Sequence, residues 1–369
     1  MIVQILTKAR YIPLVMLCLL LWSCNGTTTV KKKEVKPVEL VYPQPPEDPR
    51  FYFEMMLLSS AQVVGKDTET HWKELLTGEK ERGEGLGKPF DVAACQGRVF
   101  VSDTVQRRVA AFDFANQRFF EIGTQEPGVL QKPLGINTDA NCNLYVADSS
   151  QKTVFIYDKD GEYISAVGGS DWFHRLSHVA VNPDGNKIFA VDTGGVQTED
   201  HRIRVFDVQT GEHLYDIGKR GKENGQLNLP RDVEVGPDGM VYVVDGANFR
   251  IQVFDQEGQF VSTFGSVGTR YGQFSRPKGI ALDPSGNIYV TDAAFGNFQI
   301  FSPAGELLLY IGDRSNRPGP AKYLLPAGID IDEDGRVYFV GQFYRKIDIF
   351  RPASLPAGEG HIGRALNAQ

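Results

Sequence analysis

Cysteine, histidine and tryptophan are scarce in this chain of 369 residues, which has four Cys, six His and three Trp. The Cys and His residues form no RING-like cluster, so that kind of zinc module is excluded. A Gly-x-Ser-x-Gly motif is also absent, which excludes the nucleophile elbow of α/β-hydrolases. Between residues 51 and 352, no stretch has helical apolar spacing over the length of a packed helix, and this predicts an all-β fold.

What the chain does contain is a repeated hydrophobic tripeptide that ends in Asp. Successive copies are 44 to 53 residues apart, and Tyr338–Gly341 is a sixth copy that lacks the acid. A period of this length predicts a β-propeller rather than a solenoid. The five acidic residues are Asp103, Asp148, Asp192, Asp245 and Asp292.

Other positions repeat in step with this Asp. A Pro stands fifteen residues earlier in four units, with Ser177 at that place in the third unit and Pro89 one residue out of register in the first. An aromatic residue follows nine positions after the Asp, and a Gly closes most units. Short apolar runs and turn residues predict four strands in each unit, hence six four-stranded antiparallel blades.

The two ends of the repeat array are complementary. After Lys346–Phe350 the last unit has no fourth strand, whereas residues 51–58 form a strand-like run that belongs to no unit. Placing this run beside Phe350 would close the ring and remove two exposed strand edges. We therefore expect closure by an N-terminal strand that joins the last blade.

The repeat resembles that of the NHL family of six-bladed β-propellers. The segments Pro277–Asp283 and Gly286–Asp292, with Arg250–Asp255 in the unit before, are similar to that family's repeat. The resemblance covers residues 51–352. It implies the fold and leaves the activity open, because one fold hosts many functions.

The N-terminal residues resemble the signal peptide of a bacterial lipoprotein. Lys8 and Arg10 precede an apolar run, Ile12–Trp22, that is too short to span a bilayer comfortably. The sequence that ends at Cys24 is similar to a lipobox, which implies a signal peptide at residues 1–23 and a lipid on Cys24. An uncleaved membrane anchor and a soluble secreted protein are the alternatives.

Residues 24–50 are rich in Thr, Lys and Pro and are expected to form an extended tether, and residues 353–369 a polar tail. Asn25 after the Cys resembles lipoproteins sent to the outer membrane, on its periplasmic side or its surface. Loss of Lys8 and Arg10 with the signal peptide changes the net charge from −7 to −9. This acidity argues against nucleic-acid binding.

Two cysteines, Cys95 and Cys142, remain besides Cys24 once the signal peptide is removed. Alignment of the units places both in the turn between the first and second strands of adjacent blades. An oxidising compartment permits a disulfide if the Cα atoms lie within about 7 Å. The alternative is two isolated buried thiols.

The loops of the expected propeller differ in charge between its two faces. The loops that lead into the last three blades are mostly basic and include Arg231, Arg270 and Lys278, whereas the hairpin turns of the opposite face are acidic. The basic face could attract an anionic partner. The competing interpretation is that the Asp residues are turn residues and the cations are solvated loop residues.

The third unit departs from the repeat. It carries an insertion around residues 194–201, and its leading loop contains Asp171–Arg175. Departures of this kind are frequent binding sites. His174, His178 and His201 are weak candidates for a metal site, because no ligand-spacing signature accompanies them. The alternative is a set of polar loop residues around an exposed aromatic patch.

The periodic Asp residues are interpreted as caps of their own blades rather than as a catalytic ring. Propeller enzymes of the peptidyl-amidoglycolate lyase group place zinc-binding His residues just after the leading Pro. The matching positions here contain one His: they are Phe90, Leu134, His178, Arg231, Lys278 and Ala327. Gly87-Lys88-Pro89 also departs from the Glu-x-Pro of gluconolactonase-like propellers.

The sequence therefore predicts a membrane-anchored, non-catalytic propeller without a cofactor that binds a partner on its loop face. We expect an envelope protein, with a polysaccharide or an anionic small molecule as other partners. The candidate contacts are Trp172, Phe173, His174, His178, His201, Arg231, Arg270 and Lys278. The alternative function is an envelope hydrolase or lyase with a metal in or near the channel.

Overall fold

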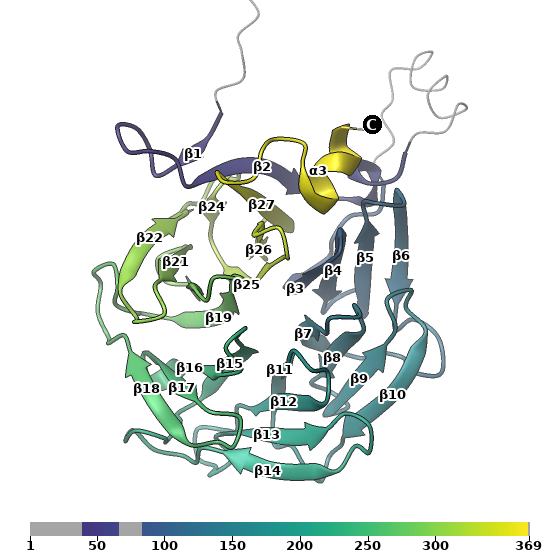
Figure 1. The fold of residues 1–369 in the computed structure, drawn as a ribbon. Helices are drawn as coiled ribbons and strands as arrows, with labels where there is room; N and C mark the ends of the chain where they lie inside the picture. The colour runs from purple at the N-terminus through teal and green to yellow at the C-terminus, as the bar shows by residue number, and fades with distance from the viewer. Residues whose placement is uncertain (1–38, 66–82, 368–369) are drawn as a thin grey trace, which may run out of the picture. The chain divides into compact units, whose positions relative to one another are not determined.

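A computed structural model describes residues 39–65 and 83–367. The predicted signal peptide, Cys24 and the first part of the predicted tether lie outside these residues. Six antiparallel sheets of the described chain are arranged around a common axis, as the six-bladed prediction requires (Figure 1). Within residues 39–65 and 83–367, no helix has the length and apolar character needed to cross a membrane.

Each blade begins with the strand nearest the axis. Blades 1 to 3 consist of β3 (Pro89–Cys95), β4 (Arg98–Asp103), β5 (Arg108–Asp113) and β6 (Arg118–Ile122); β7 (Pro133–Thr138), β8 (Leu144–Asp148), β9 (Thr153–Tyr157) and β10 (Tyr163–Gly168); and β11 (Leu176–Val181), β12 (Lys187–Asp192), β13 (Arg202–Asp207) and β14 (His213–Ile217). Blades 4 to 6 consist of β15 (Pro230–Val235), β16 (Val241–Asp245), β17 (Arg250–Phe254) and β18 (Phe260–Phe264); β19 (Pro277–Leu282), β20 (Ile288–Asp292), β21 (Asn297–Phe301) and β22 (Leu307–Ile311); and β25 (Pro326–Ile331), β26 (Val337–Gly341), β27 (Lys346–Pro352) and the N-terminal β2 (Phe51–Leu57).

The ring closes through β2, which pairs antiparallel with β27 and so confirms the predicted N-terminal closure. Phe53 lies opposite Phe350, and a register shift between Phe53 and Met55 falls at Glu54. The Glu54 carboxylate binds the guanidinium of Arg336, with Oε2 2.7 Å from Nε, and the Arg336 side chain is fully buried. An ion pair between the first strand of the ring and the turn before β26 therefore accompanies the backbone pairing.

The hydrophobic core lies between blades rather than inside any one of them. Each of the six core clusters in the described residues draws on two consecutive blades; for example, Val101 and Phe112 of blade 1 share a cluster with Val340 and Ile347 of blade 6. The inner strands also contact their neighbours around the whole ring, including β25 with β3. Because a four-stranded sheet buries little alone, the blades stabilise each other.

The glycine that closes most units has a packing role. Gly168 has φ +95°, and a Cβ there would come 2.6 Å from the ring of Phe173. The same relation joins Gly265 to Phe274 and Gly123 to Leu130. Each Gly therefore makes room for one apolar residue of the loop that leads into the next blade.

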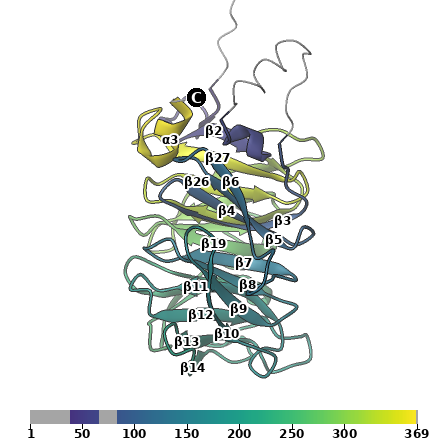
Figure 2. The same ribbon diagram turned by 90° about the vertical axis from the view of Figure 1, so that its right-hand side faces the viewer.

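Two segments expected outside the propeller carry regular structure. β1 (Val41–Tyr42), within the predicted tether, pairs with β2, and α3 (Gly360–Asn367), within the predicted polar tail, lies near β2 and β27 in both views (Figures 1 and 2). Ile362 of α3 is buried in the cluster shared by blades 1 and 6. Ala365 and Leu366 of the same helix pack against this cluster, so the C-terminal segment is part of the packed fold.

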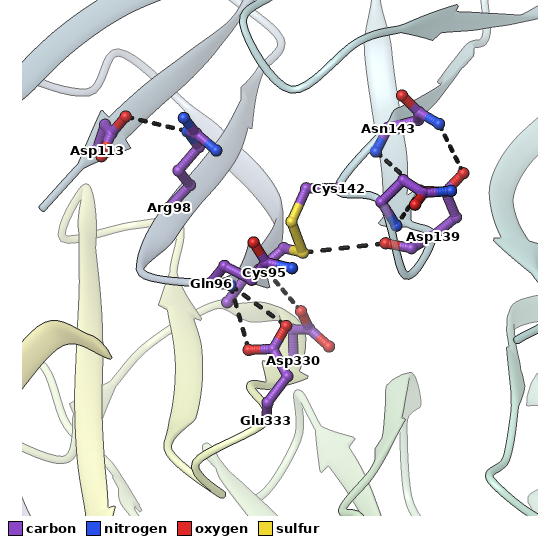
Figure 3. The surroundings of a disulfide bond; sticks show 11 residues. Cys95, Gln96, Arg98, Asp113, Asp139, Cys142, Asn143, Asp330 and Glu333 are labelled. Atoms are coloured by element: carbon purple, nitrogen blue, oxygen red, sulfur yellow. Dashed lines mark hydrogen bonds and ion pairs between the residues drawn. A yellow bond between two sulfur atoms is a disulfide. The ribbon is translucent and has the colours of Figure 1, made fainter. Parts of the chain in front are cut away.

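Blades 1 and 2 are joined by a disulfide between Cys95 and Cys142, whose Cα atoms are 5.7 Å apart (Figure 3). The backbone amide of Ala94 donates to Asp330 Oδ2 (2.6 Å) and that of Gln96 donates to Glu333 (3.2 Å). Of the two arrangements that the sequence left open, the structure has the bridge. These contacts connect blades 6, 1 and 2 on the face that carries the hairpin turns.

The buried pair that accompanies ring closure can be tested by Glu54→Gln, which leaves the buried Arg336 with Asp334, 3.2 Å from its Nη1, as its remaining carboxylate partner. We expect the free energy of unfolding, measured by urea titration, to fall by about 3 kcal/mol. Asp313→Asn is the matched control, because Asp313 pairs with Lys322 at 2.7 Å on the surface. Asp313→Asn should lower the free energy of unfolding by less than about 1 kcal/mol. Similar losses in both variants would contradict a special role for Glu54.

The disulfide closes a loop of 47 residues. Reduction should therefore lower the free energy of unfolding by about 2–4 kcal/mol, since the unfolded chain regains loop entropy. The double variant Cys95→Ala/Cys142→Ala should lose a similar amount and become insensitive to reductant. A wild-type protein whose urea midpoint does not respond to dithiothreitol would show that the bridge contributes nothing.

Candidate functional site

The loop face of the propeller is the one that carries the loops leading into each blade and the connections between second and third strands. The turn face carries the two hairpin turns of each blade. Six inner strands, β3, β7, β11, β15, β19 and β25, line the channel between these faces. The residues compared in sequence with the zinc ligands of propeller lyases lie at the loop-face end of this channel, here called the channel mouth.

Three residues from alternating blades meet at the channel mouth. The rings of Phe90 (blade 1) and His178 (blade 3) have centroids 5.4 Å apart, and Lys278 Nζ (blade 5) lies 4.9 Å from the Phe90 centroid. Gly135 lies beside His178, where a Cβ would come 2.5 Å from the imidazole Cδ2. Residues distant in sequence thus form one contiguous cluster.

His178 is only 5% exposed, and burial lowers the pKa of its imidazole to about 3, with further decreases from Lys278 and Arg231. The side chain is therefore neutral near pH 7. Its Nε2 lies 3.9 Å from Asp91 Oδ2, beyond a normal hydrogen bond. Its Nδ1 is buried without a hydrogen-bond partner among the described residues.

Cations converge on the same mouth. Burial lowers the pKa of Arg231, and the charges of Arg175 and Arg276 lower it further. Burial also lowers the pKa of Lys278 to about 8; Asp91 opposes this decrease, whereas Arg231, Lys88 and Arg276 add to it. None of these five cations forms an ion pair with a carboxylate in the described part of the chain. We call Lys88, Arg175, Arg231, Arg276 and Lys278 the mouth cations.

Deeper in the channel, three Asp carboxylates each accept a backbone N–H from the next blade. Asp91 Oδ2 binds Ile136 N (2.9 Å), Asp232 Oδ2 binds Ile280 N (3.0 Å), and Asp330 Oδ2 binds Ala94 N. Burial raises the pKa of all three, to about 7 for Asp232 and about 8 for Asp330. These acids join neighbouring inner strands, and burial favours their neutral form.

A cavity of about 330 Å³ opens at the turn-face end of the channel and is lined in part by Asn137, Glu234 and Asp330. Glu234 Oε2 accepts from Asn137 Nδ2 at 3.1 Å, and burial raises the pKa of Glu234 well above its ordinary value. The channel is therefore basic at one end and lined by buried acids at the other.

The aromatic residues of the blade 3 leading loop divide into an exposed one and a buried one. Trp172 is 39% exposed and stacks on His213 of β14, with centroids 4.6 Å apart. Phe173 is 2% exposed and packs against Phe206. Phe173 therefore belongs to the core, and only Trp172 offers apolar surface.

The three candidate metal-binding histidines are not brought together. His201 is fully buried; its Nε2 lies 2.8 Å from Gly195 O, and its Nδ1 accepts from Leu229 N. His174 is exposed next to Gly195, and His178 lies in the channel. Within residues 39–65 and 83–367, no group of three His, Cys, Asp or Glu is placed to hold a metal ion. His201 instead fixes the 194–201 insertion.

Arg270, the remaining candidate, is exposed in the leading loop of blade 5, where its backbone N–H donates to Gln273 Oε1. It shares this loop with Arg276, a mouth cation. Arg270 therefore offers a charge on the same face that takes no part in the cluster around Lys278 described above.

The periodic Asp residues act as caps, which confirms their structural interpretation. Asp292, for example, accepts the backbone N–H groups of Ser275 and Arg276 before its blade and of Ala294 after its strand. In the sixth blade, Asp348 of β27 takes over this role and binds Ala321 N and Lys346 Nζ. These carboxylates are therefore engaged in hydrogen bonds that stabilise the fold.

The buried channel acids were missed by sequence reasoning. The repeat has Gly at the second residue after the leading Pro in three units, namely Gly135, Gly279 and Gly328, whereas Asp91 and Asp232 occupy that place in two others. A comparison of this position across units would have identified both acids. The third residue before the leading Pro is apolar in the other five units, whereas in the third unit Phe173 stands four residues before Ser177. The structure pairs Leu176 with Asp192, as it pairs Pro133 with Asp148, so a shift of one residue in the alignment would have assigned Phe173 to the core.

The channel acids give a pH-dependent prediction. Because the folded protein raises the pKa of Asp330, it holds a proton that the unfolded chain releases between about pH 4 and pH 8, and stability falls as pH rises through this window. Asp330→Asn should therefore flatten the decline and stabilise the protein at pH 8 by at least about 1 kcal/mol.

Urea unfolding at pH 5 and pH 8 measures this effect. Glu306→Gln is the control, because Glu306 is an exposed carboxylate on a hairpin. If Asp330→Asn and Glu306→Gln give the same pH profile as the wild type, the carboxyl of Asp330 is not held protonated by the fold.

Comparison with known proteins agrees with this architecture. A family model described as a 6-bladed beta-propeller matches residues 92–213, and the NHL repeat matches residues 227–254 and 274–301. The E3 ubiquitin-protein ligase TRIM71 of Gallus gallus is 29% identical over 140 residues, which cover 29% of this chain and 15% of that protein. The chain thus spans less than a sixth of that relative's length.

Two solved structures share the fold. Streptogramin B lyase aligns with a TM-score of 0.53 and 14% identity over 72% of this chain and 93% of that one. A protein of unknown function from Bacteroides thetaiotaomicron aligns with a TM-score of 0.58 and 16% identity over 83% and 78%. At such identities the likeness concerns the fold alone. Together with the repeat matches and the observed blades, these findings place the chain among the NHL-repeat six-bladed β-propellers.

Proposed function

We propose that this protein is an exported bacterial lipoprotein whose propeller binds another envelope protein on its loop face and catalyses no reaction. The lipid on Cys24 would hold it at the outer membrane. The observation that carries the proposal is the combination, on one face, of cations without carboxylate partners and of exposed apolar side chains.

The exposed apolar residues of the loops lie on the loop face. Val196 is 74% exposed at the tip of the blade 3 insertion, and Phe343 is exposed between β26 and β27. Others on this face include Val105, Trp172, Val267, Tyr271 and Leu325. Most other exposed large hydrophobic residues lie on the outer strands of the blades, such as Ile164 on β10. Apolar anchors with surrounding charges are the composition of protein-binding surfaces.

The charge of the face indicates the kind of partner. The mouth cations and the exposed Arg270 and Arg317 all carry positive charge toward the loop side, although the whole chain is acidic. An acidic surface on the partner would complement this charge and speed association. A polysaccharide or a small anion would satisfy the charge and leave the apolar residues without partners.

Two features support an extracytoplasmic location. The Leu-x-Ser-Cys sequence at Cys24 follows a basic and an apolar segment, as in exported lipoproteins. The Cys95–Cys142 disulfide is of the kind that persists in oxidising compartments. Both agree with an envelope protein.

An envelope hydrolase or lyase is the second candidate, and one observation favours it. His178 lies in the channel, neutral and unpartnered at Nδ1, although its pKa of about 3 makes it a weak base near pH 7. The histidines do not converge into a metal site, and the acids nearest the channel are engaged by backbone amides. Binding therefore accounts for more of the loop face than catalysis does.

Site-specific photo-crosslinking in the native host tests the proposal on the full-length protein. A photoreactive residue at Val196 should form an adduct with one envelope protein. The double variant Arg175→Glu/Arg276→Glu should weaken this adduct at least about tenfold, since two exposed cations are reversed. Lys159→Glu is the matched control, because Lys159 is an exposed cation on the turn face.

The outcomes separate the candidates. A protein adduct that survives the double variant, or one that Lys159→Glu removes equally, would count against the loop face as the interface. Adducts that consist only of polysaccharide would assign the face to a glycan.

A further inference from the structure

We propose that the channel mouth is a binding site for a compact anion with at least two negative charges, of phosphate or carboxylate chemistry, held by Arg231, Lys278 and the imidazole of His178. This site shares cations with the proposed docking surface, but its evidence does not depend on whether a protein binds the loop face.

The first argument is that the fold pairs its cations elsewhere. Arg250 binds Asp245 at 2.8 Å, Arg98 binds Asp113 at 3.0 Å, and the buried Arg336 binds Glu54. The mouth cations have no such partner in the described residues, although Arg231 and Lys278 are largely buried. Burial of an uncompensated charge is costly, so their clustering is explained best by an anion that binds there.

The second argument is that the mouth cations lower each other's pKa. Arg175 and Arg276 each act on Arg231 strongly enough to lower its pKa, and Arg231, Lys88 and Arg276 do the same to Lys278. Such effects require that the five charges lie close to one another. They come from the leading loops and inner strands of blades 1, 3, 4 and 5, so they surround the mouth from several sides.

The third argument is the neutral imidazole. His178 Nδ1 is buried without a partner and lies among Arg231, Lys278 and Phe90, so it is free to donate a hydrogen bond to an anion. Phe90 supports this arrangement, because its ring contacts both His178 and Lys278. Asp91, the carboxyl nearest to His178, opposes the lowering of the Lys278 pKa, but burial and Asp232 raise the pKa of Asp91 itself and so favour its neutral form.

The chemistry of the donors specifies the ligand. Guanidinium groups offer two parallel N–H donors that match carboxylate and phosphate oxygens, and a Lys ammonium adds a point charge. Several cations around one mouth favour a ligand with more than one negative charge. An organic cation or a neutral sugar would leave these donors unpaired.

Isothermal titration of the full-length protein in detergent, at low ionic strength, tests the proposal with two probes, inorganic pyrophosphate and citrate. We expect saturable binding of at least one probe, and the stronger of the two identifies phosphate or carboxylate chemistry. Arg231→Gln and Lys278→Met should each weaken binding at least about tenfold, the loss expected for one charge-assisted hydrogen bond.

The controls distinguish a site from diffuse attraction. Arg276→Gln changes an exposed mouth cation and should weaken binding without affecting folding, whereas Arg270→Gln, in the same loop, should change affinity less than about twofold. If Arg270→Gln and Arg276→Gln weaken anion affinity equally, the attraction is a general effect of positive charge on this face and the proposal is overturned. Absence of saturable binding by the wild type would overturn it too.

A pH series with sulfate, whose charge is constant in this range, adds an independent readout. Affinity should fall between about pH 7 and pH 9 as Lys278 loses its proton, and Lys278→Met should remove this dependence. The charged groups facing Lys278 are Lys88, Arg231, Arg276 and Asp91. An unchanged pH profile in Lys278→Met would exclude Lys278 from the site. Anion binding without any crosslinked protein would support the site while rejecting the protein-binding function.

Discussion

The pairing of β2 with β27 is the constraint on which the rest of the structure depends. Every core cluster is shared by two consecutive blades, so an open ring would expose the halves contributed by blades 1 and 6. β2 supplies the outer strand that blade 6 lacks, and Leu57 and Val63 complete the cluster that blade 6 shares with blade 1. The closing strand therefore stabilises two interfaces at once.

Closure also fixes the geometry of the channel. The inner strands are held to one another by channel carboxylates that accept amides of the following blade, as with Asp91 and Ile136 N. This arrangement places acids in a poorly solvated space, where burial raises their pKa. It also allows residues of alternating blades, such as Phe90, His178 and Lys278, to meet across the axis.

The repeat spacing in the sequence predicts some features of this structure and not others. Strands, blade number and closure were predictable, because each depends on spacing within one unit or on an unpaired run at the chain end. The channel mouth was not, because its members come from non-adjacent blades and differ in residue type. Phe173 shows the same limit: its loop departs from the repeat, but its own position is a core position in every unit. α3 is too short to give a periodic signal, and only three of its residues, Ile362, Ala365 and Leu366, pack against the cluster of blades 1 and 6.

The polar side chains that have no hydrogen-bond partner in the described part of the chain indicate what the channel mouth can bind. The cap residues, the channel acids and His201 are all engaged in hydrogen bonds that hold loops or neighbouring strands. Within the described residues, the side chains of the mouth cations and His178 Nδ1 are not, and they lie together. Several positive charges with one neutral donor can neutralise and orient an anion. Asp91, the carboxyl nearest to His178, is engaged by the backbone amide of Ile136, and burial raises its pKa. The unused groups of the channel mouth are therefore suited to hold an anion.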